Sequence, residues 1–282
     1  MIRFRSTRQL LLILYLLLVA VGLFVRIEPA YGDYEPVPYQ EGKDVVWVPT
    51  AQALADKMLD LAKVTSQDYV IDLGSGDGRI VITAAKRGAR ALGIEYNPDL
   101  VALSKRNAVK EGVTAKTQFL QADLFESDFS QATVITMFLL PEINLKLRPK
   151  ILDLKPGTRI ASNSFNMDEW EPDQTVVVTP EEGCDNKFCE AYFWVVPAKV
   201  AGAWKLPQGE LWLTQSFQMI SGTLKTGSNV VAITKGRMNG DLISFTAGGA
   251  QYAGRLSGNT MQGTCRSGGS TVKWNASRDS GK

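Results

Sequence analysis

The stretch DLGSGDGR begins at Asp72 and carries a second carboxylate at Asp77. Its glycines occupy alternate positions, Gly74, Gly76 and Gly78. A turn with so few side chains lets a ligand come closer to the backbone than a Cβ would permit. A dinucleotide-binding turn has the spacing G-x-G-x-x-G, whereas this turn reads G-x-G-x-G. Two carboxylates would repel a pyrophosphate, so the turn predicts a positively charged ligand.

Two further carboxylates stand at the ends of the next two expected strands. Glu95 follows the glycine turn by about 20 residues, the separation at which a carboxylate accepts ribose hydroxyls. Asp123, in QADLF, is placed for an adenine amino group, and Leu124 can pack on the adenine ring. S-adenosylmethionine combines ribose, adenine and positive charge, and we predict it as the cofactor. The residues predicted to bind it are Asp72, Gly74, Ser75, Gly76, Asp77, Gly78, Glu95, Tyr96, Asp123 and Leu124.

The composition limits the chemistry that these residues can perform. The 282-residue chain has no histidine, which excludes Ser-His and Cys-His nucleophiles, imidazole bases and the usual His-bearing zinc sites. No metal is expected. The 31 basic and 29 acidic residues leave a formal net charge of +2, without a basic stripe of interleaved aromatic residues. Nucleic acid is therefore not an expected partner.

From residue 45 to about residue 197 the sequence alternates between strand-like and helix-like segments. Runs that are apolar on both faces, such as residues 134–140, are typical of a parallel sheet covered by helices. The alternation predicts an α/β domain with a Rossmann-like, doubly wound, mostly parallel seven-stranded sheet. Strands are expected in YVIDLG, ALGIEYN, TQFLQAD, TVITMFLL, TRIASNSF, QTVVVTP and AYFWVVP. Helices are expected in VPTAQALADKMLDLAKV, RIVITAAKRG, PDLVALSKRNAVKEG and PEINLKLRPKILDLKPG, the last interrupted at Pro149.

After Pro197 the sequence changes to short alternating stretches separated by Gly, Asn and Ser. The signals NGD at Asn239 and SGN at Ser257 are typical of tight hairpin turns. We expect about seven or eight antiparallel strands in an all-β meander or small barrel. The predicted parts are a membrane anchor or signal segment at 1–30, a linker at 31–44, the α/β domain at 45–198 and the antiparallel β-domain at 199–282.

The first 30 residues are expected to form a hydrophobic helix outside the folded domains. Arg3, Arg5 and Arg8 precede an uncharged run at residues 10–25. This run is short for a membrane span of ~20 residues and long for a signal-peptide core of ~7–15 residues. Two alternatives stay open, an uncleaved anchor in the inner membrane, or a signal cleaved near AYG at residues 30–32, with export to the periplasm.

The three cysteines are too few for a disulfide scaffold. Cys184 and Cys189 share one short loop and can pair in an oxidising compartment. The alternative is that both remain unpaired thiols.

A set of motifs follows in order between residues 48 and 173: VPT, DLGSGDGRIVI, GIEYNP, DLF, TVITMFLLP, LKPGTRIASNSF and DEWEPD. With these motifs the stretch Val48–Pro197 resembles the class I S-adenosylmethionine-dependent methyltransferases. More narrowly, it resembles the family of the lysine methyltransferases of the ATP synthase c-subunit and the adenine nucleotide translocase, with their bacterial relatives. The resemblance covers about half of the chain and leaves out the C-terminal β-domain. It implies a methyltransferase domain at 45–198, a protein lysine as the acceptor, a membrane protein being one candidate, and Thr50 as a further cofactor-binding residue in a lid.

The acceptor is expected at the end of the fourth strand, where the sequence reads MFLLPE. Methyltransferases that act on amide or adenine nitrogens usually have an Asn/Asp-Pro-Pro-aromatic motif there, which this chain lacks. The resemblance implies that Phe138, Leu139 and Pro141 shape the acceptor channel, and the alternative is a buried strand end. A lysine acceptor needs no histidine, because its proton can pass to water.

Trp170 is the fourth candidate for the acceptor channel, and no residue is assigned a catalytic role with certainty. It lies in NMDEWEPD beside Asp168 and Glu169. An aromatic face with nearby carboxylates can receive a cationic side chain. Alternatively, Trp170 holds down a solvated acidic loop.

Two other functions stay open from the sequence. The same site can methylate a lipid headgroup or another small molecule, with the N-terminal segment keeping the enzyme at the membrane. Alternatively, the β-domain binds a lipid or a peptide and the α/β domain is a cofactor-bound binding module. The intact carboxylates Glu95 and Asp123 favour an enzyme.

Overall fold

The computed structural model describes residues 34–278. The chain divides into a unit Met1–Glu35 and a unit Pro36–Lys282. The predicted hydrophobic helix and cleavage site at the N-terminus lie outside the described residues. Among residues 34–278, none of the helices has the length and apolar character needed to cross a membrane.

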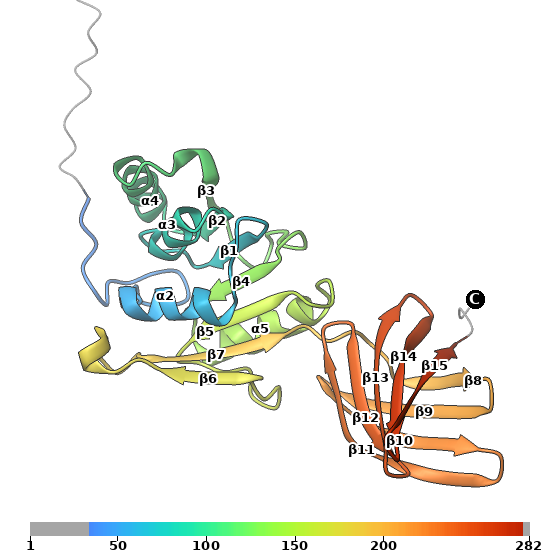
Figure 1. The fold of residues 1–282 in the computed structure, drawn as a ribbon. Helices are drawn as coiled ribbons and strands as arrows, with labels where there is room; N and C mark the ends of the chain where they lie inside the picture. The colour runs from blue at the N-terminus through green and yellow to red at the C-terminus, as the bar shows by residue number, and fades with distance from the viewer. Residues whose placement is uncertain (1–33, 279–282) are drawn as a thin grey trace, which may run out of the picture. The chain divides into compact units, whose positions relative to one another are not determined.

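The α/β part contains a seven-stranded mixed sheet in the order β3-β2-β1-β4-β5-β7-β6 (Figure 1). The first five strands in this order are parallel, and β7 runs antiparallel to both β5 and β6. The carboxyl ends of β1 to β5 therefore meet along one edge of the sheet, where open α/β sheets bind their ligands. The strands are β1 Tyr69–Leu73, β2 Arg90–Glu95, β3 Thr117–Gln121, β4 Val134–Met137, β5 Arg159–Asn163, β6 Gln174–Val177 and β7 Glu190–Val195.

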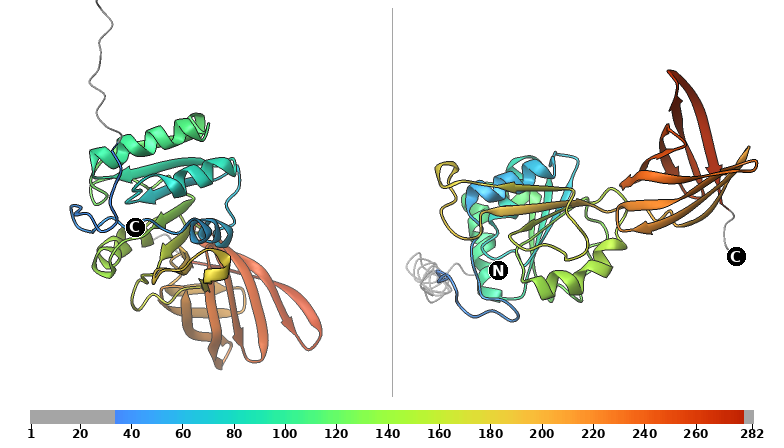
Figure 2. Two further views of the ribbon diagram at one scale, coloured as in Figure 1. Left: turned by 90° about the vertical axis from the view of Figure 1, so that its left-hand side faces the viewer. Right: turned by 90° about the horizontal axis from the view of Figure 1, so that it is seen from below.

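Helices cover both faces of this sheet, as the doubly wound prediction requires. Val70 and Val134 point to the face where α2 and α3 pack, and Ile71 and Ile135 point to the face where α5 packs. This alternation is the two-residue period of a strand that is buried on both sides. Figure 2 (right) shows α5 on the side of the sheet away from α2. The helices are α2 Gln52–Leu61, α3 Arg79–Lys86, α4 Pro98–Lys110 and α5 Pro141–Leu152, with short 3₁₀ turns η1 Thr114–Lys116 and η2 Pro180–Glu182.

Helix α5 continues through Pro149, so the predicted interruption there is wrong. A proline inside a helix removes one backbone hydrogen bond and costs about 3 kcal/mol. Leu147 and Ile151, on either side of it, are both buried against the sheet. Burial of such side chains contributes about 1.5–3 kcal/mol each, which offsets the cost of the proline.

The C-terminal part is a closed barrel of eight antiparallel strands, which confirms the prediction of an all-β domain and selects the barrel over the open meander. The barrel closes because β15 pairs with β8. Its interior is filled by buried side chains such as Trp204, Phe245 and Trp274. The strands are β8 Gly202–Leu206, β9 Gly209–Ser216, β10 Met219–Thr226, β11 Asn229–Asn239, β12 Leu242–Ala247, β13 Ala250–Ser257, β14 Thr260–Ser267 and β15 Ser270–Ser277.

Of the two alternatives for the cysteine pair, the structure has the disulfide between Cys184 and Cys189. It closes the loop between η2 and β7. Cys265 is free and buried in the barrel.

Candidate active site

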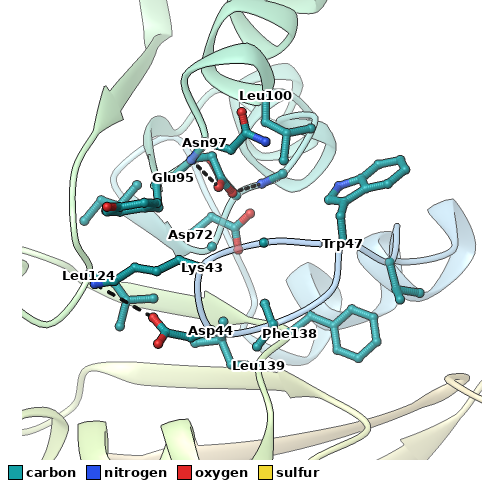
Figure 3. Close-up of a pocket in the computed structure, with 18 of the residues that line it drawn as sticks. Lys43, Asp44, Trp47, Asp72, Glu95, Asn97, Leu100, Leu124, Phe138 and Leu139 are labelled. Carbon is teal, nitrogen blue, oxygen red and sulfur yellow. Dashed lines mark hydrogen bonds and ion pairs between the residues drawn. The ribbon is translucent and has the colours of Figure 1, made fainter. Parts of the chain in front are cut away.

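A pocket lies where the carboxyl ends of β1 to β4 meet, and the predicted cofactor-binding residues gather around it (Figure 3). Each strand ends in one part of the wall: β1 in the glycine turn, β2 in Glu95, β3 in the segment with Asp123, and β4 in Phe138. The lining includes Thr50, Asp72, Gly74, Ser75, Gly76, Asp77, Glu95, Tyr96, Asp123 and Leu124, but not Gly78.

The glycine turn approaches the pocket with its bare backbone. Gly76 has a φ of +54°, and a Cβ built on it would lie 2.7 Å from Nε1 of Trp47. Gly78 has a different role from the one predicted, because a Cβ there would meet Phe119 and Ser104 at 2.8 and 2.9 Å. Glycine at this position permits the start of α3 to pack closely on α4 and β3.

Glu95 both holds the glycine turn and faces the pocket. Its Oε2 accepts a hydrogen bond from the backbone N–H of Gly76, and its Oε1 accepts one from the N–H of Asn97, each at 2.9 Å. An ionised carboxylate has about four lone-pair positions. Each oxygen therefore keeps one position for a ligand hydroxyl, which is the pattern that a ribose requires.

Asp72 is a buried carboxyl group at the centre of the site, with only 3% of its surface exposed. Burial raises its pKa to about 7, and the nearby charges of Glu95 and Asp77 act in the same direction, while a hydrogen bond from Thr136 opposes them. The Thr136 hydroxyl donates that bond over 2.6 Å. A carboxylate so destabilised in its charged form gains from a cation in the pocket.

The other carboxylate of the turn, Asp77, forms an ion pair with Arg79. Arg79 Nη2 lies 2.5 Å from its Oδ2, and Arg79 Nη1 donates a hydrogen bond to the Thr50 carbonyl at 2.6 Å. Asp77 therefore ties the turn to the segment before α2, and Asp72 is left as the unpaired carboxylate of the turn.

Asp123 is engaged by a residue that the sequence did not single out. Lys43 Nζ lies 2.5 Å from its Oδ2, and the N–H of Phe125 donates to its Oδ1 at 2.9 Å. The Lys43 hydrogen bond, followed by that of Phe125, lowers the pKa of Asp123. Lys43 lies in the segment predicted as a linker, where a single lysine gives no signal that it reaches the third strand.

The segment around Lys43 forms part of the pocket wall. Tyr39 and Trp47 bring its two ends together, since the Tyr39 N–H donates to the Trp47 carbonyl at 2.7 Å. Figure 3 shows Trp47 and Phe138 on one side of the pocket and Glu95 on the other. Trp47 was not assigned to the site from sequence, although it precedes the VPT motif directly.

The charged and polar groups of the pocket fit S-adenosylmethionine. Glu95 has free lone pairs for ribose hydroxyls, and buried Asp72 suits the ammonium and sulfonium charges. Ser75 is one of the residues that line the pocket. Its buried hydroxyl lies against Gly93 of β2, where a Cβ would come within 2.5 Å of the Oγ, so the glycine at position 93 makes room for this side chain.

Of the four residues predicted to form the acceptor channel, two line the pocket. Phe138 and Leu139 line the pocket, whereas Pro141 begins α5 and is not part of the lining. Trp170 is completely buried and packs on Trp194, with ring centroids 6.0 Å apart. A buried indole cannot receive an acceptor, so this candidate is wrong and Trp170 holds its loop in the core.

Comparisons with known proteins agree with this geometry. Residues 72–174 match the family model described as ANTKMT methyltransferase domain. A protein-lysine N-methyltransferase of Saccharolobus islandicus is 42% identical over 155 residues, which cover 54% of this chain and 94% of that protein. The lysine N-methyltransferase of the ATP synthase c-subunit from Rattus norvegicus is 40% identical over 107 residues, 38% of this chain and half of that protein.

A solved structure is similar over the same part of the chain. It is described as an RNA methyltransferase from Salinibacter ruber in complex with S-adenosyl-L-homocysteine, and it is 46% identical, with a TM-score of 0.50. The similarity covers 54% of this chain and 96% of that one. The archaeal relative is matched over nearly its whole length, and the chain therefore belongs to the family of S-adenosylmethionine-dependent methyltransferases that includes the protein-lysine N-methyltransferase of Saccharolobus islandicus.

Proposed function

We propose that the protein methylates the side-chain amine of a lysine in a protein acceptor. The observation that carries the proposal is the wall after β4, where Phe138 and Leu139 line the cofactor pocket without an Asn/Asp-Pro-Pro-aromatic motif. An apolar wall suits the methylene stem of a lysine better than a planar amide or base. The Saccharolobus and rat relatives, whose names specify lysine methylation, support the same acceptor.

The residues of the site would act by binding and exclusion of water. When bound, S-adenosylmethionine supplies a methyl group on a cationic sulfur, and the C–N bond to the amine forms as the C–S bond breaks. Asp72 and Glu95 would hold the cofactor, and Phe138 and Leu139 would exclude water from the amine. The ammonium must lose one proton before it reacts, and without histidine in the chain that proton passes to water. Positioning and desolvation of this kind supply most of the rate enhancement in such a transfer.

The proposal is tested by following a labelled methyl group into three acceptor classes. The full chain is incubated with methyl-labelled S-adenosylmethionine and a cell extract that contains membranes, and protein, lipid and RNA are then separated. Label in protein, recovered as methylated lysine and lost with Glu95→Ala, is the expected result. Label in lipid would move the assignment to an amine headgroup. Label in RNA would agree with the description of the Salinibacter protein as an RNA methyltransferase and contradict the proposal.

We also propose that the enzyme is held at the inner membrane through its N-terminal segment. The support is the uncharged run at residues 10–25 after three arginines. S-adenosylmethionine is made in the cytosol, which favours an uncleaved anchor with the enzyme on the cytosolic side, whereas the Cys184–Cys189 disulfide favours an oxidising compartment. Fractionation of cells tests this proposal. Full-length protein in the membrane fraction, inaccessible to external protease, is expected, and a shortened protein in the periplasm would contradict it.

A further inference from the structure

Three phenylalanines from three separate segments meet beside the cofactor pocket. Phe138 follows β4, Phe165 follows β5, and Phe188 precedes β7. The Phe138 ring centroid lies 6.1 Å from that of Phe165 and 5.2 Å from that of Phe188, and the remaining pair is 6.2 Å apart. These strands are neighbours in the order β4-β5-β7, so their ends bring the rings together. We call these three residues the phenylalanine cluster.

The cluster is not part of a hydrophobic core. All three side chains are half-buried, and none belongs to the core clusters of the described residues. Aromatic side chains that contribute to no core and gather at a pocket indicate a binding surface. Phe138 itself lines the cofactor pocket, which makes the cluster continuous with that pocket.

The backbone holds Phe165 in place at some cost. Ser164 has a φ of +57°, a region that non-glycine residues rarely occupy and that often marks functional positions. The Phe165 carbonyl accepts hydrogen bonds from the hydroxyl of Ser162 at 2.6 Å and from the amide of Asn144 at 3.1 Å. The backbone conformation is therefore fixed at Ser164 and at the Phe165 carbonyl.

Phe188 is held by its own loop. Its N–H donates to the side chain of Asn186 at 2.8 Å, and the disulfide between Cys184 and Cys189 closes the loop around it. The Nζ of Lys187 lies 5.0 Å from the ring centroid of Phe188, so a lysine ammonium already occupies one face of the cluster. Rings of this kind attract cations and pack against methylene chains.

A short polar path joins the cluster to the cofactor pocket. Asn163, two residues before Phe165, is completely buried, and its Nδ2 donates to Oγ1 of Thr50 at 3.1 Å. Thr50 is part of the pocket lining. Its hydroxyl oxygen keeps one lone pair that can accept an amine N–H. Asn163 thus links the end of β5, from which Phe165 follows, to Thr50 in the pocket lining.

We propose that the phenylalanine cluster is the entry of the acceptor channel and binds the methylene stem of the acceptor lysine, with its amine directed toward Thr50. This inference rests on the proposed lysine acceptor and adds the residues that recognise it. The cluster presents only hydrocarbon rings, so it selects for the length of an unbranched chain. Phe165 and Phe188 would contact the acceptor but do not line the cofactor pocket, which separates their role from cofactor binding.

The test uses the full chain and three probes, the Nα-acetyl amides of lysine, ornithine and 2,4-diaminobutyrate, which lose one methylene at each step. KM and kcat for methylation are measured together with the Kd of the cofactor. Binding of the lysine probe is measured by calorimetry with S-adenosylhomocysteine present. Each missing methylene should raise KM roughly fourfold in the unmodified protein.

Phe165→Ala and Phe188→Ala should each raise the KM and the calorimetric Kd for the lysine probe roughly three- to tenfold, with the cofactor Kd unchanged. Phe188→Leu should raise them less, because it keeps an apolar side chain. Phe217→Ala is the matched control, since Phe217 is a half-buried phenylalanine in the turn between β9 and β10, and it should change neither constant.

The results distinguish failure of the phenylalanine cluster as the lysine-binding surface from failure of the proposed lysine methylation. If the unmodified protein methylates the lysine probe but both alanine variants keep its KM, the cluster does not bind the acceptor and the proposed function stands. If the alanine variants weaken cofactor binding as much as probe binding, the cluster belongs to the cofactor site and the inference is wrong. If the unmodified protein binds the cofactor but neither binds nor methylates any probe, the cluster does not recognise the lysine stem and the inference is wrong, while the lysine acceptor is decided by the label recovered in protein.

Discussion

Asp72→Asn should stabilise the cofactor-free protein at high pH and weaken its binding of the cofactor. The carboxyl is buried, and its pKa is raised from 3.8 to about 7. One pKa unit corresponds to 1.36 kcal/mol, so a shift of about three units makes the ionised group unfavourable by up to about 4 kcal/mol at neutral or higher pH. Asparagine keeps an oxygen for the hydrogen bond from Thr136 and removes the buried charge.

The sign of the pH effect follows from the raised pKa. Between about pH 4 and pH 7 the folded protein holds this proton and the unfolded chain releases it, so the group's contribution to stability falls as the pH rises. Urea unfolding of the cofactor-free protein at pH 5 and pH 8 measures this. The gain in the free energy of unfolding from Asp72→Asn should be larger at pH 8 than at pH 5 by about 2–3 kcal/mol, because the effect grows only between the two pKa values and part of it is already present at pH 5.

Cofactor binding should change in the opposite sense. A cation in the pocket favours the ionised carboxylate, so the affinity of the unmodified protein should increase between pH 5.5 and pH 7, while that of Asp72→Asn should be lower and nearly constant. Calorimetric titration with S-adenosylmethionine, which carries both the ammonium and the sulfonium charge, gives both curves. Equal stabilisation at pH 5 and pH 8 would refute the raised pKa, and equal affinities would refute contact between Asp72 and the cofactor's charge.

Three further predictions concern other residues. Glu95→Gln should weaken cofactor binding roughly tenfold or more, because charge-assisted hydrogen bonds to hydroxyls are lost; an unchanged Kd in calorimetry would exclude ribose binding by Glu95. Lys43→Met should raise cofactor affinity about two- to fivefold, because it frees the Asp123 oxygen that Lys43 now engages; reduced affinity in the same titration would show that Lys43 contacts the cofactor instead. Trp170→Ala should lower the free energy of unfolding by about 3–5 kcal/mol; urea unfolding at nearly unchanged stability would contradict its burial.

Much of the cofactor site can be predicted from the sequence because ligand-binding residues of parallel sheets lie at the carboxyl ends of the strands. Asp72, Glu95 and Asp123 each stand at or just beyond the end of a recognisable apolar strand, and parallel strands bring those ends together. The barrel was predictable for a similar reason, since alternation and hairpin signals such as the one at Asn239 are local.

The acceptor side could not be predicted in the same way. Phe165 and Phe188 are single aromatic residues in loops. The pairing of β5 with β4 brings Phe165 to Phe138, and the insertion of β7 beside β5 brings Phe188 there. Lys43 reaches Asp123 across 80 residues of sequence, which no local pattern reveals. The prediction of Trp170 as an acceptor-channel residue failed for a different reason. Its acidic neighbours suggest solvent exposure, but the indole packs inward on Trp194.

The most direct test of the central claim is to identify the methylated atom in the protein product. Labelled protein from the incubation with the full chain is hydrolysed to amino acids, and the labelled amino acid is identified by chromatography and mass spectrometry. We predict that the label is recovered in methylated lysine and that Glu95→Ala abolishes it. Label in any other amino acid, or methyllysine formed equally by Glu95→Ala, would contradict lysine methylation at this site.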